Sequence, residues 1–229
     1  EALSAQAIRR LSALGLQELT NTAWSFARLD VADDPLLPAL ASASIARISQ
    51  FGPQGIANTA WAFAPRGLRN ETLLQAIASQ AIASIQEFSG QDLANTAWSF
   101  AQRDFAHAPL LKSIAAAAIP RLTDCSPPHI AATAWSFSAL GFPHPPLRTA
   151  IAAAAIPRLS EGHGPLQGTF SCRQISNLAW SVACLGFDDA PLLHSLAAAA
   201  RRRIKDGAAD WRACELGNMA WAFSLLRFP

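Results

Sequence analysis

The sequence contains no tyrosine, one methionine and a charged fraction of only 15%. Because 51% of its residues are hydrophobic, it is not a disordered linker, a class of segment that is rich in charge and poor in apolar side chains. The formal net charge is +2, whereas a domain that binds nucleic acid mainly through phosphates usually has a plainer basic excess. Much of the apolar content is alanine, the best helix former, so the composition predicts an all-helical chain.

Cysteine is scarce and follows no metal or disulfide pattern. The four cysteines are Cys125, Cys172, Cys184 and Cys214, with no CxxC pair among them. We therefore predict reduced thiols in an intracellular compartment. No apolar run reaches the roughly 18 residues that span a bilayer, because Pro120 and Pro157 interrupt the alanine-rich stretches. We expect no membrane insertion.

Motifs of catalysis are missing from the sequence. None of the five histidines pairs with a cysteine or carboxylate at a metal-ligand spacing, and there is no Gly-rich phosphate loop, nucleophile elbow or HExxH. We therefore predict no catalytic residue, no metal, no cofactor and no enzymatic activity. The sequence also lacks a starting methionine and a signal or transit peptide, so we expect that targeting information was removed or never belonged to this fragment.

A tryptophan block recurs along the whole chain. Its six copies are NTAWSFA at 21–27, NTAWAFA at 58–64, NTAWSFA at 95–101, ATAWSFS at 132–138, NLAWSVA at 177–183 and NMAWAFS at 218–224. The first four tryptophans are 37 residues apart, and the last two follow at 45 and 41, with insertions at 162–169 and around 207–210. Self-similarity at a period of 20–50 residues is typical of a repeat array.

Each repeat predicts two helices. A short Gly, Ser or Pro segment precedes the tryptophan block, apolar residues then recur at helical spacing, and this helix ends near Gly67, Gly141 or Gly186. The next helix opens at a proline in four of five cases, and Pro120 and Pro157 should kink it or tighten its last turn. We predict an all-α fold, an α-solenoid of about six helix-turn-helix repeats with a 37-residue period. Residues 1–229 would form a single array, a slice of a longer protein, with units ending near 31, 68, 105, 142, 187 and 229.

Asparagine stands three residues before the tryptophan in five of the six repeats, with Ala132 as the exception. Residues three apart share a helix face, so this pair could form a ladder that contacts a ligand. The near-invariance favours a structural role instead. In that interpretation the buried amide bonds loop backbone of the adjacent unit and the indole is the core wedge between hairpins.

Arginine recurs 23 residues after the tryptophan. The position is held by Arg10, Arg47, Arg121, Arg158 and Arg203, with Ser84 in the gap. Guanidinium groups bind phosphate through two parallel hydrogen bonds, so a ladder with one arginine per hairpin predicts contacts to RNA phosphates. The alternative is that these arginines complement the dipole in the last turn of a helix, and the two roles are not exclusive.

Variable polar residues near the helix starts are candidates for reading bases, with a solvated surface as the alternative. Those near the start of the tryptophan helix are Gln17, Gln54, Gln91, His129 and Arg173, and those near the start of the other helix are Gln75 and Lys112.

The blocks FGPQGIANTAWAFA at 51–64 and PLLPALASASIARIS at 35–49 carry a family resemblance. They resemble the octotricopeptide repeat, and the period fits its relative, the heptatricopeptide repeat, still better. These families are similar to the helical part of FAST-kinase-like proteins, and many carry a RAP domain, which these residues lack. The resemblance implies an α-solenoid that binds organellar RNA in a mitochondrion or plastid, with the mitochondrion preferred.

The sequence therefore leads to two functional hypotheses. The first is an organellar RNA-binding helical-repeat protein that binds single-stranded or ribosomal RNA in processing, stabilisation, translation or ribosome assembly. The alternative is a scaffold that packs against other proteins of a large organellar assembly with little or no RNA contact.

Overall fold

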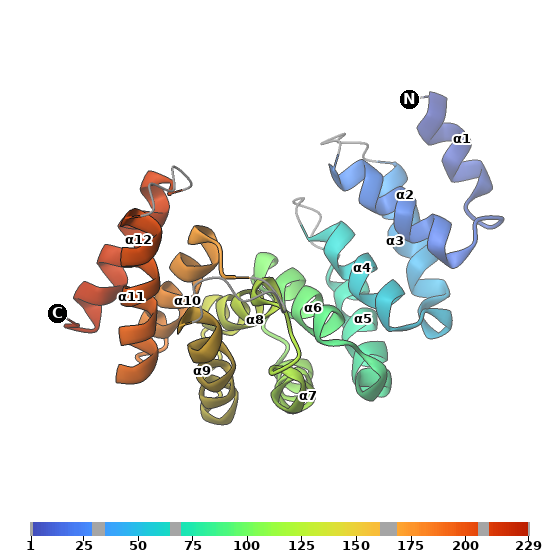
Figure 1. The fold of residues 1–229 in the computed structure, drawn as a ribbon. Helices are drawn as coiled ribbons and strands as arrows, with labels where there is room; N and C mark the ends of the chain where they lie inside the picture. Colours follow the sequence, from blue (N-terminus) through green and yellow to red (C-terminus); the bar gives the residue numbers. More distant parts are fainter. Residues whose placement is uncertain (1, 29–34, 65–69, 161–168, 206–210, 229) are drawn as a thin grey trace. The chain divides into compact units, whose positions relative to one another are not determined.

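The computed structural model describes residues 2–28, 35–64, 70–160, 169–205 and 211–228. Within these ranges the chain is all-helical, with twelve α-helices and no strand, which confirms the all-α part of the prediction (Figure 1). Several expectations lie outside the described residues: the helix end at Gly67, the unit ends near 31, 68 and 229, and the insertions at 162–168 and 207–210. The chain divides into two compact units, residues 1–114 and 115–229, and the division falls within α7.

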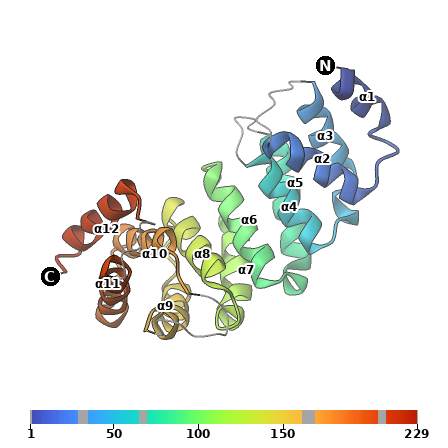
Figure 2. The ribbon, with the colours of Figure 1, turned by 45° about the horizontal axis from the view of Figure 1, so that its top comes forward.

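Unit 1 contains two layers of helices. Its elements are α1 (Ala2–Arg10), α2 (Leu16–Arg28), α3 (Leu36–Ala46), η1 (Ile48–Gln50), α4 (Pro53–Phe63), α5 (Glu71–Ser84), η2 (Ile85–Glu87), α6 (Gly90–Gln102) and the start of α7 (Ala108–Ala118). The tryptophan helices α2, α4 and α6 pack side by side in one layer, and α1, α3 and α5 pack in succession (Figures 1 and 2). The pairs α2–α3 and α4–α5 join the two layers as helical hairpins.

Unit 2 repeats this arrangement. After the end of α7 it contains η3 (Ile119–Arg121), α8 (Pro127–Ala139), α9 (Pro145–Ser160), α10 (Cys172–Cys184), α11 (Ala190–Lys205) and α12 (Ala213–Leu225). The tryptophan helices α8, α10 and α12 pack in succession, and α9 packs against α11.

Local sequence signals explain the helix ends. Pro53 occupies the first turn of α4, and α6 begins with a capping box in which Ser89 and Asp92 satisfy each other's backbone N–H groups. Gly141 has a φ of +57°, the left-handed conformation that stops α8, as the sequence predicts. Pro120 lies in the tight 3-10 turn after α7, which confirms the predicted tightening, whereas α9 continues through Pro157 to Ser160.

The buried stripe of each tryptophan helix does not contain the tryptophan. In α4 this stripe consists of Ile56, Ala60 and Phe63, which are 0%, 0% and 5% exposed and follow the i, i+4, i+7 spacing of one helix face. Trp24 is 43% exposed and Trp221 is 46% exposed, and the other four repeat tryptophans are half-buried. The prediction that the indole is the core wedge between hairpins is therefore wrong. In the first five repeats an aliphatic residue five positions before the tryptophan fills the core instead, in most of them together with a phenylalanine two positions after it.

Candidate nucleic-acid interface

A second stripe of unit 1 faces away from this core. Glutamine, asparagine and tryptophan stand at positions i, i+4 and i+7 of three successive helices, so they lie on one face of each helix. The nine residues are Gln17, Asn21 and Trp24 of α2, Gln54, Asn58 and Trp61 of α4, and Gln91, Asn95 and Trp98 of α6. We call this set the amide–indole face.

The three indoles form a continuous stack. The ring centroids of Trp24 and Trp61 are 6.0 Å apart with an interplanar angle of 28°, and those of Trp61 and Trp98 are 6.3 Å apart with an angle of 23°. None of the three side chains is buried. The stack therefore crosses three helices and remains accessible to a planar ligand at its exposed edges.

The amides of the face are also accessible. The three glutamines and Asn21 are exposed, while Asn58 and Asn95 are half-buried. None of the six side-chain amides forms a hydrogen bond within the part of the chain that the structure describes. The expectation that the repeated asparagine is buried and bonds loop backbone is therefore wrong, and its donor and acceptor groups are available to a ligand.

An open groove of about 350 Å³ lies where the first turns of α2 and α4 meet. Four amides of the amide–indole face line it, from Gln17, Asn21, Gln54 and Asn58, together with the backbone around Gly52 and Gly55. Its lining contains no charged side chain. We call it the amide groove.

Gly55 helps to keep the amide groove open. The equivalent position carries Glu18 in α2 and Asp92 in α6, whereas Gly55 has no side chain to project there. A Cβ atom at Gly55 would lie 2.9 Å from the ring of Phe51, which is buried. The amide groove thus depends on the glycine of one repeat and on the spacing of glutamine, asparagine and tryptophan that three repeats share.

The ladder arginines contact backbone carbonyls. Arg47 Nη1 donates to the carbonyl oxygen of Leu14 at 2.5 Å, and Arg203 Nη2 donates to that of Phe170 at 3.0 Å. Leu14 and Phe170 hold the same repeat position, ten residues before the tryptophan. Arg158 likewise donates to the carbonyl of Thr123. Arginine at this position therefore joins the end of one helix to the loop before a tryptophan helix.

Two members of the ladder differ. Arg121 lies in η3 and donates to the carbonyl of Ala117, one turn earlier, at 2.5 Å. Arg10 ends α1 and is exposed, and no hydrogen bond of its side chain is found among the described residues. The ladder positions lie at or near helix ends, as their repeat position implies, and phosphate binding by their remaining donors stays a prediction.

The other base-reading candidates are spread over the two units. Gln75 and Lys112 are exposed on α5 and α7, away from the layer that carries the amide–indole face. His129 Nδ1 is 2.9 Å from Ser126 Oγ at the start of α8, and the exposed Arg173 in α10 lies 3.9 Å from the carboxylate of Glu215. Gln17 and Gln54 of this set line one groove, with Gln91 on the next helix of the same face.

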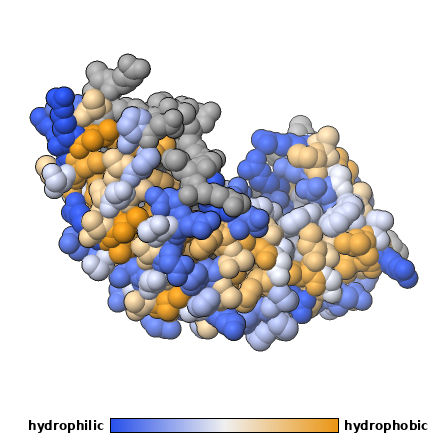
Figure 3. Space-filling model, turned by 180° about the vertical axis from the view of Figure 1, so that it is seen from behind, coloured by the Kyte–Doolittle hydropathy of each residue, from blue (hydrophilic) through white to orange (hydrophobic). Residues whose placement is uncertain are grey.

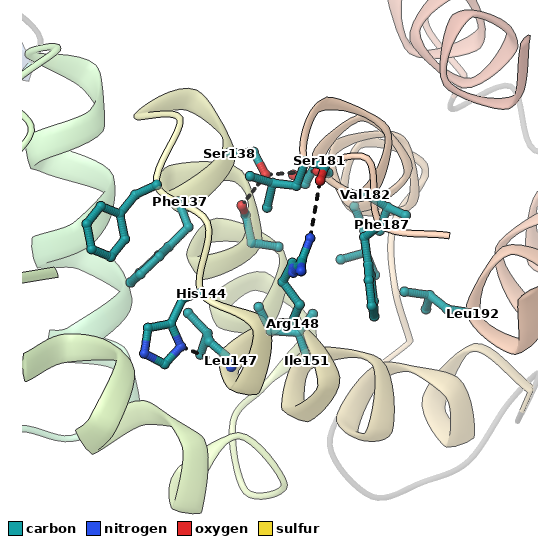
Figure 4. Close-up of a pocket in the computed structure, with 14 residues that line it drawn as sticks. Phe137, Ser138, His144, Leu147, Arg148, Ile151, Ser181, Val182, Phe187 and Leu192 are labelled. Carbon is teal, nitrogen blue, oxygen red and sulfur yellow. Dashed lines mark hydrogen bonds between the residues drawn. The ribbon is translucent and has the colours of Figure 1, made fainter. Parts of the chain in front are cut away.

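Unit 2 contains a small, partly open cavity between α8, α9 and α10 (Figure 4). Its volume is about 20 Å³, enough for about one water molecule, and its walls are mostly apolar. The guanidinium of Arg148 donates to the carbonyl of Leu185 at 3.2 Å and lies 5.0 Å from the ring centre of Phe187. This arginine therefore holds α9 to the end of α10, and the cavity is too small for a ligand.

The described residues were also compared with three other kinds of site: a metal centre, an activated thiol and a membrane span. Hydrophilic and hydrophobic residues are intermingled on the face drawn in Figure 3. Burial raises the pKa of the Cys125 thiol, an effect that Arg158 opposes, so this cysteine is not an activated thiolate. Across the described ranges there is no group of side chains that could hold a metal ion and no helix long and apolar enough to cross a membrane.

Sequence reasoning missed the importance of the amide–indole face because it treated the sameness of asparagine and tryptophan as a sign of burial. The signal was present in the spacing, since glutamine, asparagine and tryptophan together fall on a stripe distinct from the apolar one.

Comparison with known families gives one match, and no curated protein matches the chain. The matching family model is described as RNA-editing substrate-binding complex 6 protein and covers residues 1–124, a range that includes the whole amide–indole face. An RNA-associated helical family is thereby confirmed, although the match is not to the octotricopeptide or heptatricopeptide repeat. Since the match covers more than half of its length, the chain belongs to the RNA-editing substrate-binding complex 6 protein family.

Proposed function

We propose that this chain is an RNA-binding, non-enzymatic subunit of an RNA-editing substrate-binding complex and that it holds single-stranded RNA on the amide–indole face. The observation that carries the proposal is the stack of Trp24, Trp61 and Trp98, none of which is buried, beside a row of amides that form no hydrogen bond among the described residues. Aromatic side chains bind unpaired bases by stacking, and amides pair with base edges.

The family match supports this assignment. Its description names RNA editing and a substrate-binding complex, and it covers the unit that carries the face. The helical-hairpin layers are compatible with an α-solenoid, in which a strand of RNA would run across successive tryptophan helices. The family is consistent with a mitochondrial location and lends no support to a plastid or a ribosome.

The test replaces Trp61, the middle member of the stack, with alanine. The matched control is Trp180→Ala, at the same repeat position in α10, where no aromatic ring contact is found among the described residues. Fluorescence anisotropy with a labelled single-stranded 24-nucleotide RNA should show an affinity loss of about tenfold for Trp61→Ala, because removal of the middle indole interrupts the aromatic surface against which bases pack. The control should lose less than about twofold. An equal effect of both variants, with circular dichroism showing both folded, would contradict an RNA-binding role of the stack.

A scaffold role is the second candidate, and the last hairpin favours it. Ile204, Leu216, Trp221 and Leu225 are all more than 40% exposed there. In the other five repeats the residue equivalent to Leu216 is 0–1% exposed. The covering element that this equivalence indicates is a helical hairpin of similar chemistry, and the scaffold hypothesis assigns it to another protein of the complex.

Hydrogen exchange on the assembled complex tests the scaffold role. Residues 213–225 should gain protection on assembly, and Leu216→Arg should abolish that protection while RNA affinity is unchanged. Free exchange of this helix in the complex would refute the scaffold surface.

A further inference from the structure

The amide groove between α2 and α4 differs from the rest of the amide–indole face because the surface is hollowed there. Its volume of about 350 Å³ is at the lower end of the range for small-molecule sites, roughly 300–1,000 Å³. The groove therefore has room for one small ring system with its substituents, and not for a folded segment of protein.

The lining sets the charge of the occupant. The groove offers amides, a threonine, glycines and apolar side chains, and no cation. Glu18 follows Gln17 at the start of α2, where its carboxylate accepts from the N–H of Gly15 at 2.7 Å. A phosphate group would find no cation in this lining, and Glu18, the next residue after Gln17, adds a negative charge, so the lining disfavours an anionic occupant.

The lining also sets the hydrogen-bonding pattern of the occupant. Each side-chain amide carries a donor and an acceptor in one plane, which matches a flat ring edge that donates and accepts side by side. Glutamine and asparagine pair in this way with adenine, through its N6 and N7 atoms. Gln17 and Gln54 come from adjacent helices, so they approach such an edge from two sides of the groove.

From these observations we infer that the amide groove is a base-specificity pocket. It takes one unpaired nucleobase, edge first, while the sugar and phosphate remain outside. The inference rests on the proposed RNA-binding function. It adds that the amide groove between α2 and α4 distinguishes a nucleotide that carries a base from an abasic one.

Two variants remove the pocket in different ways. Gln54→Ala deletes one of the pairing amides, and Gly52→Leu fills the groove. Gly52 has a φ of −73°, and a Cβ atom there would meet no atom within 4 Å, so the larger side chain fits the backbone. The matched control is Gln6→Ala, which truncates an exposed glutamine on α1, outside the layer of tryptophan helices.

The measurement compares a 12-nucleotide oligoadenylate with a fully abasic 12-mer of the same charge, by fluorescence anisotropy on the full chain. The wild type and Gln6→Ala should prefer the oligoadenylate by the same factor. Gln54→Ala and Gly52→Leu should reduce this preference by about tenfold, the effect of one bidentate base contact, with an unchanged salt dependence. Ultraviolet crosslinking followed by mass spectrometry should place oligoadenylate on the peptide that contains Phe51 and Gln54.

The outcomes separate the pocket from the RNA-binding function. If Trp61→Ala weakens binding of the oligoadenylate while both groove variants keep the wild-type preference, the pocket is overturned and the function stands. If the wild type binds neither oligomer, both are overturned. If a groove variant unfolds, the crosslink decides, because its absence from the wild-type groove peptide overturns the pocket.

Discussion

Replacing Arg47 with alanine tests whether the arginine ladder holds the helical hairpins together or holds RNA. The guanidinium Nη1 of Arg47 donates to the carbonyl oxygen of Leu14 at 2.5 Å and joins the end of α3 to the turn before α2. A hydrogen bond to a charged group contributes about 1.5–3 kcal/mol. Because Arg47 is half-buried, we expect the lower end, about 1.5 kcal/mol, after solvent screening.

Hydrogen exchange is the appropriate assay because a chain of two compact units need not unfold in one step. A local loss of about 1.5 kcal/mol corresponds to roughly tenfold faster exchange of amides protected by this contact. We expect this acceleration in the first turns of α2, around Leu19 and Thr20, whose backbone follows the Leu14 carbonyl.

Arg10→Ala is the control, because it removes the same charge from the same repeat position in unit 1. Arg10 is exposed, so its loss should leave exchange in α2 unchanged. The structural interpretation is refuted if Arg47→Ala leaves exchange unchanged and both variants lose RNA affinity to the same extent, with a shallower salt dependence. That result would assign the ladder to phosphate binding.

Two further predictions concern unit 2. Gly141→Ala should destabilise the end of α8 by about 1 kcal/mol, because Gly141 has a φ of +57° that a Cβ atom disfavours. A thermal melt unchanged from that of the wild type would contradict this prediction. Iodoacetamide at pH 8 should modify the exposed Cys214 well before Cys125, because burial raises the pKa of the Cys125 thiol and leaves less thiolate at that pH. Peptide mass spectrometry gives the order of modification, and equal rates at the two cysteines would contradict the prediction.

The helical layers could be predicted from the sequence because their signals are local. Helix starts depend on residues such as Pro53 and Ser89, and helix ends depend on residues such as Gly141, each acting within a few positions of the chain. Apolar spacing then identifies the buried face without knowledge of the neighbours, as for Ile56 and Phe63.

The candidate site could be predicted only in part, because it depends on contacts between repeats. A repeat position that is polar and variable along the chain predicts Gln17 and Gln54 as candidates, but the groove between them depends on how closely α2 and α4 pack. The unchanged recurrence of tryptophan predicts a place in the core. A residue that stacks on its own equivalents in adjacent repeats recurs for the same reason, and sequence alone does not separate the two.

The ladder arginines show the same limit. Their place near a helix end follows from the repeat, but the acceptor of Arg47 lies 33 residues earlier in the chain, as does that of Arg203. No periodicity within a single repeat indicates which carbonyl a side chain will reach.

The tryptophan stack also has an optical consequence. Indoles whose centres are 6.0 and 6.3 Å apart are close enough for their electronic transitions to couple, so the near-ultraviolet circular dichroism of unit 1 depends on the relative orientation of α2, α4 and α6. Any ligand or partner that rotates one of these helices against the next will change that spectrum. The protein therefore carries an intrinsic, label-free sensor of the geometry between its repeats.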